Sequence, residues 1–230
     1  MAEKKTKGYA FFTAIRENDG ETVRAMVEGD PALVNTPAPK RPLDTRYMSP
    51  LQVSLCTGRH AEIAWFLLEH GADVNYCAAK ELCKDGYPVL FDGVNAALWN
   101  ARRFEWDGTD INHLVWKHTK EEADEAFRFL ARMIELGADV NATDRYNRNA
   151  LMEAVGEANK ICPVVNAETG EDYPGRIITP EMCEDFRRIF KLLIDAGADR
   201  ENRSSFSGKT IREHFADEPV WRICGLLFGD

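Results

Sequence analysis

A group of carboxylates beside a tryptophan is the first feature of this sequence that could do chemistry. Glu105, Asp107 and Asp110 lie in one short segment that also contains Trp106. Most glycosidases use two carboxylates on either side of the scissile bond, and an aromatic ring can supply a platform for the sugar. Such a pair acts only across a cleft. The group therefore raises the question of an enzyme without predicting one.

The histidines and cysteines give weaker signals. His113 and His118 are five residues apart, which separates them by about 500° around a helix and places them on different faces. A metal site could combine either histidine with Cys77 and Cys83, but structural zinc sites use more closely spaced pairs. The six cysteines are instead expected to be reduced thiols that act as small hydrophobic side chains. No phosphate-binding, zinc-protease, nucleophile-elbow or calcium-loop motif is present, and we expect no cofactor.

Composition limits the partners. The chain has 230 residues, of which 44% are hydrophobic, and its net charge is −9. A negative net charge disfavours binding to nucleic acid or to an anionic membrane and favours long-range attraction to a basic partner. The polar, lysine-rich start is not typical of a signal peptide, and no apolar run approaches the roughly 20 residues of a membrane span. These features predict a cytoplasmic protein.

A short motif recurs along the chain. Gly71-Ala72-Asp73-Val74-Asn75 has near-copies at Gly137 to Asn141 and at Gly197 to Asp199. Repetition of this kind is typical of a stacked array, in which each unit buries its apolar face against its neighbours. Thr119 and Thr179 each resemble a helix N-cap followed by acidic residues. The sequence therefore predicts long helices over 120–136 and 180–196, as well as helices over 9–16, 21–28 and 60–70.

One repeat resembles a known family. Ser49-Pro50-Leu51-Gln52, Gly58, Ile63, Leu67-Leu68 and the motif at Gly71 resemble an ankyrin repeat, with Gln52 where the family usually has histidine. The resemblance implies an all-α ankyrin-repeat solenoid of about five helical-hairpin repeats with finger loops. It implies a single domain over 1–230, with repeats at about 9–35, 46–75, 92–141 and 142–202 and a cap at 203–228.

The motif copies are farther apart than one ankyrin period, so two inserted loops are expected, at 104–118 and 161–178, each between the first and second helix of a repeat. A six-repeat array is the alternative, because Gly108-Thr109-Asp110-Ile111-Asn112 resembles a worn copy of the motif. Both inserted loops are too apolar to be idle. They are expected either to pack on each other or over the stack, or to form a platform for a partner.

In the family, partners generally contact the finger loops and the exposed face of the first helices. The resemblance thus implies a non-enzymatic protein-binding module, such as an intracellular inhibitor, an immunity protein or an adaptor. The alternative is an enzyme or a small-molecule or metal-binding protein with a site between the inserted loops. Four arginines, at 46, 103, 145 and 148, predict a locally positive groove. The candidate partner-binding residues are Arg46, Met48, Asp92, Asn95, Arg145, Tyr146 and Arg148 in the fingers, Thr57, Arg103, Phe104 and Glu157 on the helices, and Trp106, Trp116 and Tyr173 in the inserted loops.

Overall fold

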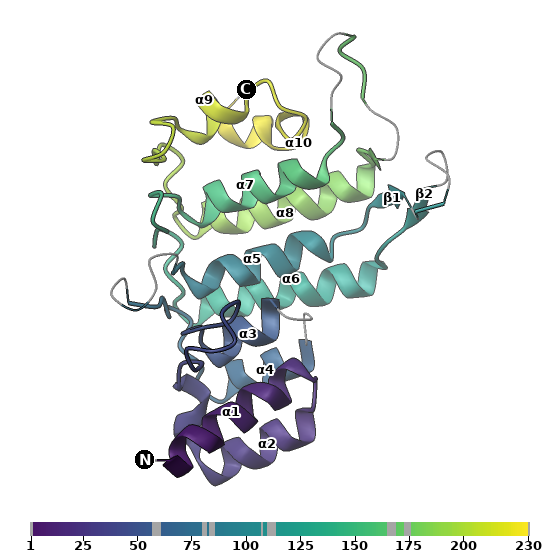
Figure 1. Cartoon of the computed structure of the whole chain (residues 1–230). Coiled ribbons are helices and arrows are strands. Elements are labelled where there is room, and N and C mark those ends of the chain that lie inside the picture. The colour runs from purple at the N-terminus through teal and green to yellow at the C-terminus, as the bar shows by residue number, and fades with distance from the viewer. Residues whose placement is uncertain are drawn as a thin grey trace.

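The computed structural model describes residues 2–56, 61–79, 82, 86–106, 108–109, 114–164, 169–172 and 176–229, with the backbone alone at 2–6. Its helices form a stack of helical hairpins whose two ends carry the two termini (Figure 1). The first helices of successive hairpins pack in one layer and the second helices in another. The hairpins are α1 (Ala2–Arg16) with α2 (Gly20–Gly29), α3 (Pro50–Cys56) with α4 (Ala61–Glu69), α5 (Val89–Trp99) with α6 (Lys120–Glu135), α7 (Ala150–Ile161) with α8 (Pro180–Asp195), and α9 (Ile211–Phe215) with α10 (Trp221–Cys224).

Two short 3₁₀ helices, η1 (Pro31–Asn35) and η2 (Gly225–Phe228), complete the helical elements of the described residues. In the first four hairpins, the second helix is followed by a segment that leads to the next hairpin. We call three of these segments, residues 36–49, 142–149 and 200–210, the finger loops; they lie along the left edge of the stack (Figure 1). Within the described part of the chain, no helix is long and apolar enough to cross a lipid bilayer.

Local signals set the limits of the long second helices. The Thr119 hydroxyl accepts a hydrogen bond from the backbone N–H of Glu122, and the Glu122 carboxylate accepts one from the N–H of Thr119, which is a capping box. Thr179 caps α8 through the N–H of Met182, and Pro180 follows in the first turn, where its missing N–H costs nothing. Both helices begin where the sequence predicts and end within one residue of the predicted position.

The repeated glycines end these helices. Gly71, Gly137 and Gly197 have φ values of +85°, +91° and +90°, in the left-handed region that glycine adopts most easily. The asparagine that ends the motif has a second task. The side-chain amide of Asn75 donates to the carbonyl of Gly137 at 2.9 Å and accepts from the N–H of Asp139 at 2.8 Å.

This contact, which we call the asparagine bridge, joins one repeat to the next. Asn35 makes the same two contacts with Gly71 and Asp73, and Asn141 makes them with Gly197 and Asp199. Each bridge satisfies backbone groups at a helix end that would otherwise need water. The motif therefore ends one helix and also fixes, through its asparagine, the position of the next hairpin.

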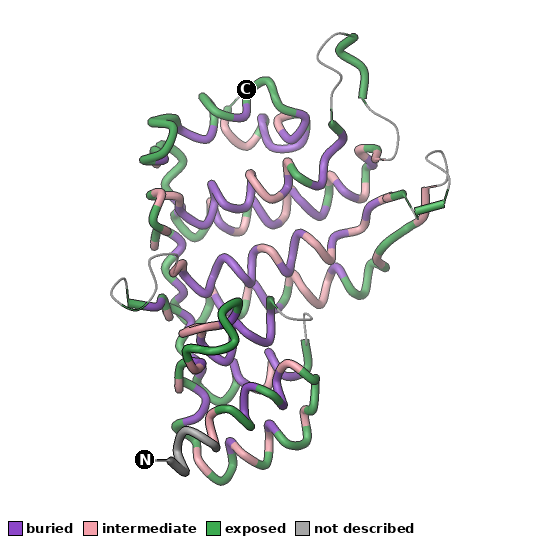
Figure 2. The backbone as a smooth tube through the Cα atoms, viewed as in Figure 1, coloured by how far each residue is buried: buried purple, intermediate pink, exposed green. Residues whose placement is uncertain are grey.

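The core runs continuously through the stack. The second helices α6 and α8 bury one face and expose the other, whereas the first helices α3 and α5 are buried almost all round (Figure 2). Phenylalanines along the whole stack are fully buried. They include Phe11, Phe12, Phe91, Phe186 and Phe190.

The inserted loops depart from the all-α prediction because they form a small sheet. Its strands are β1 (Phe104–Trp106), β2 (Leu114–Trp116) and β3 (Arg176–Ile177), in the order β2-β1-β3 with antiparallel pairing. The mostly helical class is confirmed, and strands are the correction. Because β3 comes from the second loop, the expectation that the two loops pack on each other is also confirmed.

Register places most of the apolar side chains of the sheet on one face. Residues directly opposite in an antiparallel pair point to the same side, and neighbours along a strand point to opposite sides. Phe104 lies opposite both Trp116 and Ile177, and Trp106 lies opposite Leu114. Glu105 and its two partners, Val115 and Arg176, occupy the other face. Backbone pairing thus organises a set of side chains that the sequence marks only as an apolar loop.

Candidate functional site

The first correction to the predicted site concerns Asp92 and Asn95, which lie within α5 and not in a finger loop. The resemblance places both residues before the helix, but α5 begins at Val89, directly after Pro88. The apolar residues after Pro88 fill the first turn and are buried. Asp92 is therefore in the core, and the Asn95 amide donates to Glu153 of α7 at 3.4 Å.

Arg103 and Phe104 are the second correction, since they follow α5 and lie on no helix face. Arg103 is buried, and its guanidinium donates to the carbonyl of Trp99 at 2.6 Å, lies 5.3 Å from the centre of the Trp99 ring and pairs with Glu105 at 3.4 Å. Its positive charge therefore interacts with the C-terminal end of α5 and is not directed into the groove. The prediction that Arg103 makes the groove positive is wrong.

Arg148 also has a structural task. Its guanidinium donates to Asp144 at 2.9 and 2.7 Å and pairs with the buried Glu153 at 2.9 Å. Burial raises the pKa of Glu153, and the charge of Arg148 acts in the opposite direction. Arg148 thus neutralises a carboxylate beneath the groove, and its positive charge is largely offset there.

The remaining predicted residues lie at opposite edges of the stack. Arg46 and Met48 line a small hollow of about 270 Å³ beside Tyr87. Trp106 and Trp116, 46% and 48% exposed, lie on the sheet at the edge opposite the finger loops (Figure 1). Glu157 lies on α7, where it accepts from the Trp99 indole at 3.4 Å and pairs with Lys160. Two of the predicted residues, Thr57 and Tyr173, fall outside the described residues.

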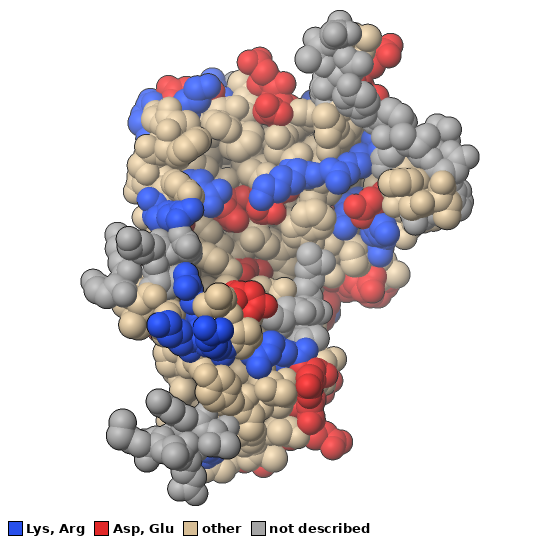
Figure 3. Space-filling model, in the orientation of Figure 1, with Lys and Arg blue, Asp and Glu red and all other residues tan. Residues whose placement is uncertain are grey.

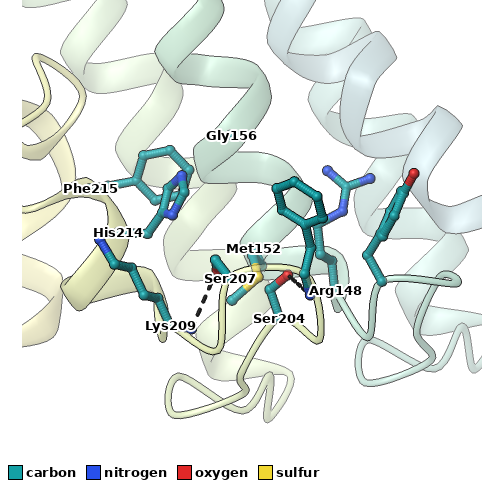
Figure 4. Close-up of a pocket in the computed structure, with 10 residues that line it drawn as sticks. Arg148, Met152, Gly156, Ser204, Ser207, Lys209, His214 and Phe215 are labelled. Carbon is teal, nitrogen blue, oxygen red and sulfur yellow. Dashed lines mark hydrogen bonds between the residues drawn. The ribbon is translucent and has the colours of Figure 1, made fainter.

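One hollow lies between α7 and α9. It has a volume of about 390 Å³, and we call it the α7–α9 hollow. His214 and Phe215 stand on one side and Arg148 on the other, with loop residues Ser204, Ser207 and Lys209 below (Figure 4). The described lining residues are Tyr146, Arg148, Met152, Gly156, Ser204, Phe206, Ser207, Lys209, His214 and Phe215.

Hydrogen bonds join the two finger loops that border this hollow. The N–H of Ser205 donates to the carbonyl of Tyr146 at 2.7 Å. Asn147 donates to the carbonyl of Arg203 at 2.8 Å, and Asn202 donates to the carbonyl of Asn147 at 2.7 Å. Loops tied in this way lose little further freedom when a ligand binds, which favours affinity.

An exposed aromatic ring stands at the rim. Phe206 is 84% exposed, and its ring meets that of Tyr146 edge-on with centres 6.0 Å apart. The Arg145 guanidinium lies 4.4 Å from the centre of the Tyr146 ring. Sequence reasoning found Tyr146 and Arg145 but missed Phe206. A phenylalanine inside the polar run Ser204-Ser205-Phe206-Ser207-Gly208 was the signal that could have identified it.

A buried polar cluster lies under the first-helix layer. Tyr87 donates to one oxygen of Asp92 at 3.1 Å, and Gln52 donates to the other at 3.2 Å. Burial raises the pKa of Asp92 to about 7, and these two hydrogen bonds only partly oppose that rise. Neighbouring Glu153 raises it further, so Asp92 holds its proton well above the pH at which an exposed aspartate loses it.

This cluster predicts a pH-dependent stability. The folded-state pKa of Asp92 lies above its ordinary value of 3.8, so its stabilising effect is complete below 3.8 and is lost as the pH rises through about 7. Between about pH 5 and about pH 6.5, we expect the free energy of unfolding to fall by about 2 kcal/mol relative to Asp92→Asn, which cannot ionise. Urea unfolding of both proteins at each pH measures this difference. Parallel curves would contradict the raised pKa.

The described residues contain no group of three or more His, Cys, Asp or Glu side chains arranged to hold a metal ion. The α7–α9 hollow and its aromatic rim form a candidate site. Its features are those of a binding surface, with a preformed depression, exposed aromatic area and cations at the rim. Comparison with protein-family models and with curated proteins finds no match for this chain.

Proposed function

We propose that this chain is a non-enzymatic, ankyrin-like repeat protein that binds another protein through its finger loops and the α7–α9 hollow. The observation that carries the proposal is Phe206, a large apolar side chain left 84% exposed on a loop that is itself tied in place. Exposed apolar area beside a depression is typical of a protein interaction site. An isolated exposed ring would carry less weight, but this one adjoins Tyr146 and the hollow.

The rim has the composition of an interface centre. Tyrosine, phenylalanine and arginine are enriched where interfaces are most buried, because they combine apolar area with directional donors. Tyr146, Phe206 and Arg145 supply these groups within one pair of loops. Within this proposal, the protein acts as an inhibitor or an adaptor. An inhibitor blocks the activity of the captured partner, and an adaptor leaves it active.

Affinity capture from the native host with immobilised protein tests the proposal. Phe206→Ala is expected to weaken capture of the partner by about tenfold or more, as loss of an interface anchor does. Leu226→Ala is the matched control, because Leu226 is also an exposed apolar residue, 73% exposed, and lies on η2 outside the hollow.

Tyr146→Ala is a second test of the same surface. It removes the ring that packs against Phe206 and leaves the Arg148 pair with Glu153 in place. Arg148→Ala is unsuitable, because it would leave the buried Glu153 carboxylate without its ion-pair partner. A loss of binding would then not distinguish a lost contact from a disturbed fold. Capture that survives both aromatic substitutions and fails with Trp116→Ala would move the interface to the sheet and overturn the proposal.

A further inference from the structure

Resting on the proposed function, we infer that the occupant of the α7–α9 hollow is an acidic segment of the partner protein that inserts one large apolar side chain. The apolar side chain enters between Phe206 and Phe215, and flanking Asp or Glu residues meet Lys209 and the neighbouring finger-loop cations. This assignment opposes the expectation from net charge, which favours a basic partner.

The lining supplies both halves of the recognition. Phe206, Phe215, Tyr146 and Met152 give it apolar and aromatic surface. Its titratable residues, apart from Tyr146, are basic: Arg148, Lys209 and His214. The ten described lining residues include no Asp or Glu. A basic segment would bring its charges toward Lys209 without a lining carboxylate to receive them, whereas an acidic segment is complementary.

Lys209 is the cation that is available in the hollow. It is exposed and forms no ion pair with a described carboxylate, whereas Arg148 is held by Asp144 and Glu153. His214 is exposed beside it and packs on Phe215 with ring centres 4.6 Å apart. The amine of Lys209 is therefore the group that an incoming carboxylate can pair with without displacing an existing bond.

The other finger loops carry the same sign of charge. Each of the three contains more Lys and Arg than Asp and Glu, although the whole chain has a net charge of −9. In loop 36–49, Lys40, Arg41 and Arg46 outnumber the single acidic residue, and none of the three pairs with a described carboxylate. Figure 3 shows basic side chains along this edge of the stack.

The compensating negative charge lies elsewhere. Glu62 and Glu69 of α4 and Glu121 of α6 are exposed on the second-helix layer. An acidic segment is thus attracted to the finger-loop edge and repelled by the second-helix layer, which orients its approach. The net charge is the sum over two surfaces of opposite sign, the finger-loop edge and the second-helix layer. Only the finger-loop edge borders the hollow.

The size of the hollow limits what enters it. A volume of about 390 Å³ lies near the lower end of the roughly 300–1,000 Å³ range of ligand pockets. It suits an anchor side chain and not a folded element. The rest of the acidic segment must then lie across the exposed finger loops, where dissolved salt screens its charge pairs.

Selection from a library of displayed random 12-residue peptides against the full-length protein tests the inference. We expect the enriched peptides to share one aromatic or leucine residue flanked by Asp or Glu. A synthetic peptide of that consensus should lose at least about tenfold in affinity to Lys209→Glu and also weaken as salt rises. Lys117→Glu is the matched control, since it makes the same charge change beside the sheet.

The outcomes separate this inference from the proposed function. Enriched peptides that are basic or uncharged, or no enrichment at all, would overturn the acidic occupant. The proposed function would still stand if Phe206→Ala weakened capture of the natural partner. If acidic peptides bound Lys209→Glu and Phe206→Ala with unchanged affinity, they would bind another surface. That result would also overturn the inference.

Discussion

Asp185→Ala is expected to lower the free energy of unfolding by about 3–5 kcal/mol, the usual cost of removing one partner of a buried ion pair. Asp185 lies on α8 and is 1% exposed. One of its oxygens accepts from the backbone N–H and the Nε of Arg102 at 2.9 and 3.0 Å, and the other accepts from Nη2 at 3.0 Å. The substitution leaves Arg102, whose side chain is only 12% exposed, with a single exposed partner, Glu184.

Glu184→Ala is the control for this prediction. Glu184 pairs with the same guanidinium at 2.7 Å but is 62% exposed, so water screens the pair and the expected loss is under about 1 kcal/mol. Equilibrium unfolding in urea measures both variants against the wild type. Equal losses for Asp185 and Glu184 would show that burial does not set the strength of this contact.

Phe186→Ala is expected to cost about 3–5 kcal/mol, because it removes a buried ring and leaves a cavity. Phe186 is fully buried on α8 and meets Phe190 edge-on with ring centres 6.2 Å apart. The same substitution at Phe206, in the next loop, is expected to change the free energy of unfolding by no more than about 0.5 kcal/mol. The comparison separates a phenylalanine that holds the fold from one that is left for a partner.

Thermal and urea unfolding of the two phenylalanine variants checks this difference. In urea, Phe186→Ala should show an earlier midpoint with a similar slope, as expected when stability alone changes. A large loss of stability in Phe206→Ala would mean that its ring packs on the protein in solution, and its exposure would then no longer support a binding role.

Local sequence signals predicted much of the helical frame. The capping threonines and the left-handed glycines act within a few residues, so α6 and α8 could be placed closely from the sequence. The apolar character of the inserted loops also showed that they must pack on something. Interactions of this range leave their mark in adjacent residues.

Other features depended on residues far apart in the chain. Asp92 was assigned to a finger loop by the resemblance, whereas it lies inside α5. Pairing of β1 with β3 joins segments about 70 residues apart, and the Arg102–Asp185 contact joins residues 83 apart. The residues next to either partner in the sequence do not indicate which distant residue it contacts. The exposure of Phe206 likewise follows from what the neighbouring loops leave uncovered.

The sheet has a mechanical consequence for the stack. At one edge, Asn141 bridges the third and fourth hairpins, and at the opposite edge β1 and β3 join the same two hairpins. Two hairpins that are connected at both edges resist relative bending and twisting more than two hairpins connected at one edge. Thermal undulation of the array should therefore leave the third and fourth hairpins moving as one rigid block, and flexing concentrates at the joints on either side.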